Sequence, residues 1–138
     1  MKFSHHGLQI ELHDDWWAET GMADFRPTSD AYRADPDAFP DRQIHDVRIE
    51  DAGPVCRGPG VSIFNDNDQA TARERVVAIL RGFRSGAAIP PVEIVNAAPG
   101  YPHQYKLTHG AHRSYCSLAA GFTHVPAVRG LDWNSLDR

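Results

Sequence analysis

The chain has 138 residues, of which 41% are hydrophobic and 23% are charged, which is enough for one domain with one hydrophobic core. Its apolar runs are too short to span a bilayer, its N-terminus lacks the apolar centre of a secretory signal, and its two cysteines do not make a disulfide framework. Its net charge of −4 disfavours a protein that grips duplex DNA through many phosphates. We therefore expect a reduced, cytoplasmic protein with no membrane association and no specific DNA binding.

Residues 1–43 predict an N-terminal extension that packs on the main domain. Apolar and polar residues alternate over 8–12, which indicates a half-buried strand. The stretch 14–21 begins with two aspartates that could cap a helix and ends at a glycine, so it predicts a short helical turn. Its adjacent tryptophans are expected to cover the core or its edge, or to leave one ring at an interface. Residues 25–40 hold three prolines and predict an irregular surface loop.

Residues 44–138 predict a compact, mixed-sheet α/β domain. One helix is expected between N-cap candidates at 65–68 and Gly86, because Ala72, Val76, Leu80 and Phe83 recur at helical spacing. A second helix is expected between Gly110 and Gly121, with Ala111, Tyr115 and Leu118 on one face. Predicted strands cover residues 47–49, 92–95, 105–107 and 122–128, and a turn-rich stretch at 57–60 leads into a short apolar piece, 61–64.

The segment His109-Gly110-Ala111-His112-Arg113 joins the end of a predicted strand to the start of a predicted helix. The first N–H groups of a helix lack internal partners, and the helix dipole adds partial positive charge there. Glycine allows close approach of the backbone to an anion, and Arg113 can offer a bidentate fork to phosphate oxygens. This Gly-x-His-Arg arrangement predicts a phosphate cradle.

An ordered set of segments resembles the ParB/sulfiredoxin superfamily over about residues 44–129. That pattern runs from a helix through a G-x-x-I-x-P-I/V-x-V strand, a strand ending in G-x-H/R-R and a further helix to a G-x-x-x-I/V-P-A strand. The matching segments here are Gly86–Val92, Tyr105–Leu107, Gly110–Arg113 and Gly121–Ala127. The resemblance implies a ParB/sulfiredoxin-like fold for the predicted α/β domain.

Families on that fold include partition proteins that bind and hydrolyse CTP, sulfiredoxins that use ATP, and a free-serine kinase. The resemblance therefore implies a nucleoside triphosphate, CTP or ATP with Mg²⁺, whose phosphates meet the segment from His109 to Arg113. Glu50 and Asp51 end a predicted strand and could supply a general base, as an acidic residue does in the serine kinase. Glu50 is the candidate catalytic residue of the two, and His112 is the second candidate catalytic residue. A simply solvated Glu50 is the alternative.

The chain also departs from both well-known activities of this fold. Sulfiredoxins carry a cysteine directly before the His-Arg pair, where this chain has Ala111. Partition proteins carry a glutamate and an arginine at Ala111 and His112, and they continue into a helix-turn-helix domain for which the chain leaves no room after Arg138. We therefore expect no sulfiredoxin activity, and the partition activity does not transfer intact either.

Other interpretations of single residues stay open. His112 and Arg113 could belong to a solvated first turn. His109 and His112 are three residues apart, but metal binding needs further ligands that the sequence does not place, so no metal site is expected. Cys116 is expected to be a small core residue, or a thiol whose pKa is lowered near a helix start. The arginines of the first main helix are expected to form a solvated face.

The function expected from these observations is nucleotide binding, with phosphotransferase or nucleotide hydrolase activity as the associated chemistry. The alternative from another class is a non-catalytic protein-interaction module, from a phage, plasmid or toxin-associated operon, that keeps the fold without the chemistry. A homodimer or a protein partner is compatible with both hypotheses. A nuclease is the weakest hypothesis, because the sequence shows no acidic metal-binding cluster.

Overall fold

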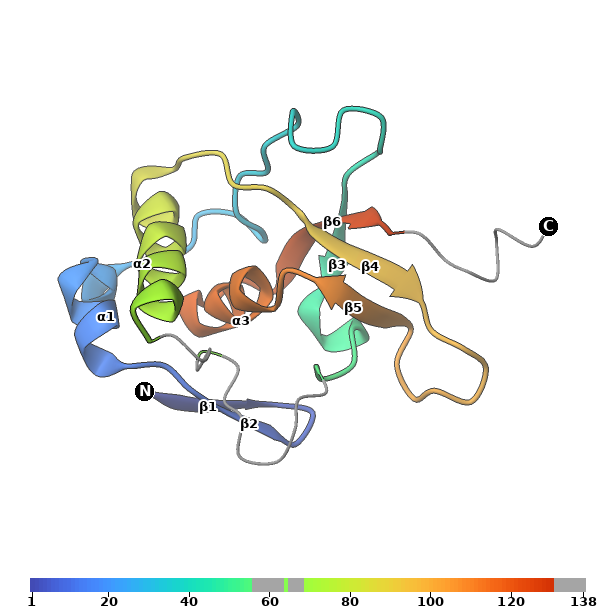
Figure 1. Cartoon of the computed structure of the whole chain (residues 1–138), viewed down its shortest axis with the longest axis horizontal. Helices are drawn as coiled ribbons and strands as arrows, with labels where there is room; N and C mark the ends of the chain where they lie inside the picture. The colour runs from blue at the N-terminus through green and yellow to red at the C-terminus, as the bar shows by residue number, and fades with distance from the viewer. Residues whose placement is uncertain (56–63, 65–68, 131–138) are drawn as a thin grey trace.

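The computed structural model describes residues 1–55, 64 and 69–130, and it has a mixed α/β fold, as the sequence predicts (Figure 1). In chain order the elements are β1 (Lys2–His5), β2 (Leu8–Glu11), α1 (Asp14–Glu19), the 3₁₀ turn η1 (Met22–Asp24), β3 (His45–Arg48), the 3₁₀ turn η2 (Ile49–Asp51), α2 (Gln69–Ser85), β4 (Val92–Asn96), β5 (Tyr105–His109), α3 (Ala111–Ala120) and β6 (His124–Arg129). From β3 onward the helices and strands follow the predicted order.

The main sheet has four strands in the order β3-β6-β4-β5. Strand β6 runs antiparallel to β3 and parallel to β4, and β4 runs antiparallel to β5. The parallel pair places Val92 opposite Ala127, and both side chains are buried. The sheet is therefore mixed, and the crossover between its parallel strands passes through β5 and α3.

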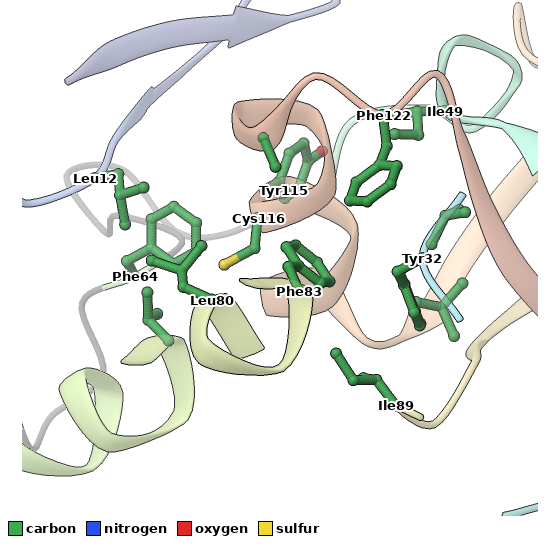
Figure 2. Close-up of a cluster of buried hydrophobic side chains, with 14 of the residues drawn as sticks. Leu12, Tyr32, Ile49, Phe64, Leu80, Phe83, Ile89, Tyr115, Cys116 and Phe122 are labelled. Atoms are coloured by element: carbon green, nitrogen blue, oxygen red, sulfur yellow. The ribbon is translucent and has the colours of Figure 1, made fainter. Parts of the chain in front are cut away.

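The helices form successive layers beside the sheet (Figure 1). Helix α3 packs against β4 and β6 on one side and against α2 on the other, and α1 packs against α2. The predicted apolar face of α2 is confirmed, because the side chains of Ala72, Val76, Leu80 and Phe83 are all buried. Figure 2 shows Cys116 pointing from α3 toward Leu80 of α2. Fully burying one Val, Leu or Phe side chain contributes about 1.5–3 kcal/mol, so the buried face of α2 is a main source of stability.

The N-terminal residues contribute to the same hydrophobic core. Strands β1 and β2 form a hairpin whose two turn residues, His6 (φ 49°) and Gly7 (φ 85°), both have positive φ, as in the turns favoured by two-residue hairpins. Strand β1 was not predicted from the sequence, since its residues are mostly polar. Ile10, Leu12, Trp16 and Met22 are buried in the same hydrophobic cluster as residues of α2 and α3. Trp17 is only partly buried, so the adjacent tryptophans differ in environment.

Several predicted boundaries and caps are wrong. His13 is the N-cap of α1, and Asp14 and Asp15 lie in its first turn. Their negative charges interact favourably with the positive end of the helix dipole there. Ile49 lies in η2, not in the strand before it, and β6 begins at His124, not at Phe122.

The connections between the elements agree with the sequence only in part. The predicted loop at 25–40 is largely irregular but forms one parallel bridge, between Ala34 and Ile89. The predicted turn at 57–60, most of the apolar piece at 61–64 and the cap candidates at 65–68 lie outside the described residues. Among the helices of the described part, none is both long and apolar enough to cross a membrane.

Candidate functional site

Gly110 forms the junction between β5 and α3, and the structure explains why this position is a glycine. Its φ of 101° and ψ of 30° lie in the left-handed region, which other residues adopt at a cost. A Cβ atom built here would come within 2.6 Å of Cγ1 and 2.9 Å of Cβ of Val92 in β4. The predicted strand–glycine–helix junction is therefore present, and the glycine lets it pass close to β4.

The N-terminus of α3 opens directly after this junction. Its N-cap is Gly110, which has no side chain to bond the first N–H groups of the helix. The first helical hydrogen bond runs from the N–H of Ser114 to the carbonyl of Gly110, at 2.9 Å. The N–H groups of the three residues between them have no partner inside the helix. The positive end of the helix dipole lies at the same place.

A pocket of about 690 Å³ lies at this helix start, and we call it the Gly110 pocket. The whole segment from His109 to Arg113 lines it, so the structure brings together all five residues that the sequence singled out for ligand binding. Arg75 of α2 also lines it. Among the described lining residues there are two arginines and two histidines but no aspartate or glutamate. The pocket is therefore suited to an anion.

Arg113 has a structural contact as well as a place in the pocket. Its Nη1 donates to the carbonyls of Pro90, at 3.1 Å, and Pro91, at 3.0 Å. The hydroxyl of Tyr32 donates to the same Pro90 carbonyl at 2.6 Å. Arg113 thus ties the first turn of α3 to the chain just before β4. Its Nε and Nη2 make no hydrogen bond to any residue in the described part of the chain and can reach a ligand.

The two histidines of the segment have different surroundings. The Nε2 atom of His112 is shielded from solvent, and its ring lies 5.7 Å from that of Phe64, centroid to centroid. The side chain of His109 is 73% exposed, and its Nε2 lies 3.6 Å from Oε2 of Glu93. Glu93 also accepts a hydrogen bond from Arg42 at 2.8 Å. His112 is therefore the inner imidazole of the pocket, and His109 lies at its rim.

Glu50 is not placed with these residues. It lies in η2 with a 73% exposed side chain that pairs with Arg48 at 2.7 Å. Its carbonyl accepts a hydrogen bond from Nε2 of His6. Glu50 is not among the described residues that line the Gly110 pocket, and the structure offers no contact between it and His112.

Cys116 and the candidate metal ligands are also accounted for. Cys116 is fully buried, and this burial raises the pKa of its thiol. The alternative of a lowered thiol pKa is therefore wrong, and Cys116 is the small core residue expected from the sequence. Within the described ranges, no group of three or more His, Cys, Asp or Glu side chains is arranged to hold a metal ion.

The sequence did not identify the wall of the pocket that α2 supplies. Arg75, Ala78 and Ile79 all line it, and they are three and four residues apart, which places them on one helix face. The arginines of α2 were expected to form a solvated face. All four are exposed, and Arg73 and Arg84 pair there with Glu19 and Asp24. The helical spacing was the available signal, but only the packing of α2 beside α3 shows what this face adjoins.

Comparisons with protein-family models, with curated proteins and with solved structures give no match. The fold and the site together define a small mixed α/β protein with a cationic pocket at a strand–glycine–helix junction.

Proposed function

We propose that the Gly110 pocket binds a nucleotide through its phosphates. The observation that carries the proposal is the lining: four side chains that are or can become cationic, and no carboxylate among the described lining residues, around a helix N-terminus. A phosphate group there would accept hydrogen bonds from N–H groups at the start of α3 and from the guanidinium of Arg113. The resemblance of the sequence to the ParB/sulfiredoxin superfamily supports the same ligand.

The rest of the pocket suits the base and sugar of a nucleotide. Its walls include Val55, Ile79, Ile89 and Leu107, which give it apolar surface beside the cationic end. Its volume of about 690 Å³ lies within the range of about 300–1,000 Å³ that is typical of small-molecule sites. A nucleotide with CTP or ATP chemistry has this division into an apolar body and an anionic tail.

Phosphoryl transfer or nucleotide hydrolysis is the reaction class that we propose for such a site. His112 is the inner titratable group, so it is the candidate for moving a proton. The described lining residues offer no carboxylate ligand, and Mg²⁺ would be held by phosphate oxygens and water. Glu50 would require a change of position to serve as the base, since it pairs with Arg48 outside the described lining.

A non-catalytic interaction module is the second candidate, and one observation favours it. Gly110 packs against Val92, and Arg113 holds the Pro90 and Pro91 carbonyls. Both residues therefore have a role in the fold that requires no ligand. On this alternative the pocket would bind no nucleotide, and the feature that the function requires would be the shape of the domain.

The test is a thermal-shift panel of ATP and CTP, each with and without Mg²⁺, followed by affinity measurements on three variants. A ligand at about 100 times its Kd should stabilise the fold by about 2.7 kcal/mol. Arg113→Ala should weaken binding by about ten- to a hundredfold, the effect of a charge-assisted bidentate contact. Because Arg113 also holds two carbonyls, Arg75→Ala provides a second test that leaves those bonds intact.

The matched control is Arg81→Ala, since Arg81 is exposed on α2 and is not among the described lining residues. It should bind nucleotide like the parent. If all three variants bind equally well, the phosphate cradle is wrong. If the parent binds no nucleotide, the interaction module replaces the proposed function.

A further inference from the structure

A second pocket, of about 580 Å³, lies between the segment that follows η1 and the C-terminal end of α2. It shares no described lining residue with the Gly110 pocket. Three arginines line it, Arg26, Arg33 and Arg84, and we call it the arginine-rimmed pocket. It is a separate site whose chemistry the nucleotide proposal does not use.

The floor of this pocket is aromatic. The ring of Phe83 stacks on that of Tyr32 at 5.4 Å between centroids and meets the ring of Phe122 edge-on at 5.2 Å. Phe25 lies 6.0 Å from Phe122 and is only partly buried. Figure 2 shows the Tyr32, Phe83 and Phe122 side chains near one another in the buried cluster. All four line the pocket, so an apolar or aromatic group can pack there.

The three arginines retain donors that can bind a ligand. Arg26 donates from Nη1 to the carbonyl of Phe25, and Arg84 donates from Nη1 to Asp24 in an exposed pair. The side chain of Arg33 makes no hydrogen bond or ion pair to any described residue. Its backbone is nevertheless fixed, since its carbonyl accepts the N–H of Ile89 at 2.9 Å. An arginine with a fixed backbone and an uncommitted guanidinium is suited to recognise a carboxylate or phosphate.

The charge of the lining also favours an anion. Three arginines and one acidic residue, Asp24, line the pocket, which gives a formal charge of +3 − 1 = +2 in a chain whose net charge is −4. The C-terminal end of α2, which lies here, has the opposite preference. Two of its carbonyls are already bonded, however, those of Phe83 by the N–H of Gly86 and of Gly82 by the N–H of Ala87.

The geometry points to a binding site for a small organic anion that carries an aromatic ring, with the ring on the phenylalanine floor and the anionic group at Arg33. Tyr32 contributes its ring and not its hydroxyl, which is bonded to the carbonyl of Pro90. The anionic group is a carboxylate or a phosphate, because both match the guanidinium fork.

Isothermal titration calorimetry with phenylacetate, phenyl phosphate and the neutral phenylacetamide tests this site. At least one of the two anions should bind, and phenylacetamide should bind about tenfold or more weakly. Arg33→Gln should lower the affinity for the anion by about the same factor. Arg81→Gln should leave the affinity for the anion unchanged. Arg81 is an exposed residue of α2 and is not among the described lining residues of either pocket.

The outcomes separate this site from the nucleotide site. Amide shifts on binding should fall at Phe25, Phe83 and Phe122 and not at Gly110–Arg113, and Arg33→Gln should bind nucleotide like the parent. The inference is overturned if neither anion binds at millimolar concentration, if phenylacetamide binds as well as phenylacetate, or if both arginine variants lose equal affinity. None of the three results that would overturn the inference depends on nucleotide binding.

Discussion

The two parts of α3 differ in how their polar groups are satisfied. At the buried part, the hydroxyl of Tyr115 donates to Nδ1 of His5 at 2.8 Å and accepts the N–H of Val55 at 3.3 Å. Nε2 of His5 donates to the carbonyl of Ile49 at 3.0 Å, which fixes the neutral tautomer with its proton on Nε2. At the N-terminal turn, by contrast, the first N–H groups have no partner within the helix, and Nε and Nη2 of Arg113, which lines the pocket, make no hydrogen bond to any described residue.

The difference shows which part of the helix maintains the fold and which part can bind a ligand. Buried polar groups that all find partners hold segments together, since each lost partner leaves a desolvated group behind. The His5–Tyr115 cluster joins β1, η2, residue 55 and α3 in this way. Changes at this cluster should therefore affect stability, and changes at the turn should affect binding.

Deleting residues 1–24 is expected to have the largest effect. It removes His5 together with Ile10, Leu12, Trp16 and Met22, which are buried in the core. At about 1.5–3 kcal/mol for each buried apolar side chain, the loss approaches the whole net stability of about 5–15 kcal/mol. The truncated chain should show no cooperative thermal transition by circular dichroism. The exposed substitution Gln9→Ala serves as the control, and a truncated chain that melts like the parent would show that the segment is dispensable.

Tyr115→Phe is the smaller test of the same cluster. It keeps the ring but leaves Nδ1 of His5 and the N–H of Val55 without the hydroxyl, which should cost about 1–3 kcal/mol. Tyr105→Phe is the matched control, because among the described residues its hydroxyl accepts only from the exposed Gln104 side chain, at 2.9 Å. Urea unfolding measures both. Equal stability of the two variants would contradict the role of the cluster.

Local patterns allowed much of the fold and part of the site to be predicted. Helical spacing identified the buried face of α2, and a strand end followed by glycine, histidine and arginine identified the α3 junction, since each signal lies within a few residues. The chain order of strands and helices then indicated the mixed α/β class. These features depend on neighbours in sequence, so the sequence contains them directly.

The features that were missed depend on distant residues. Strand β1 is mostly polar, and the partners of its buried His5 are Tyr115, 110 residues away, and the Ile49 carbonyl. Arg75 reaches the pocket because α2 packs beside α3. The loop at 25–40 provides six of the fourteen described residues that line the arginine-rimmed pocket, yet its composition indicated only an irregular connection. Glu50 likewise shows the effect of packing, because it pairs with Arg48 and is not among the described residues that line the Gly110 pocket.

Acid should weaken the His5–Tyr115 cluster, and this effect is the smallest of those predicted here. Burial, more than any other factor, lowers the pKa of His5 below its ordinary value of 6.5, and the nearby His6 and His103 act in the same direction, while the Ile49 hydrogen bond and Glu50 oppose it. The unfolded chain therefore binds a proton at this residue more readily than the folded one. The stability due to neutral His5 is present above about pH 6.5 and is lost as the pH falls toward the folded pKa.

Urea unfolding between pH 7.5 and 5.5 measures this loss. His5→Gln keeps a donor for the Ile49 carbonyl but cannot titrate, so its stability should fall less over this range than that of the parent. Asp14 does not confuse the comparison. Its carboxyl pKa is lowered by the hydrogen bond from the N-terminal amine, and the stability it contributes is lost only below about pH 3.8, outside the range. If parent and His5→Gln lose stability in parallel, protonation of His5 is not the cause, and other groups set the acid sensitivity of the fold.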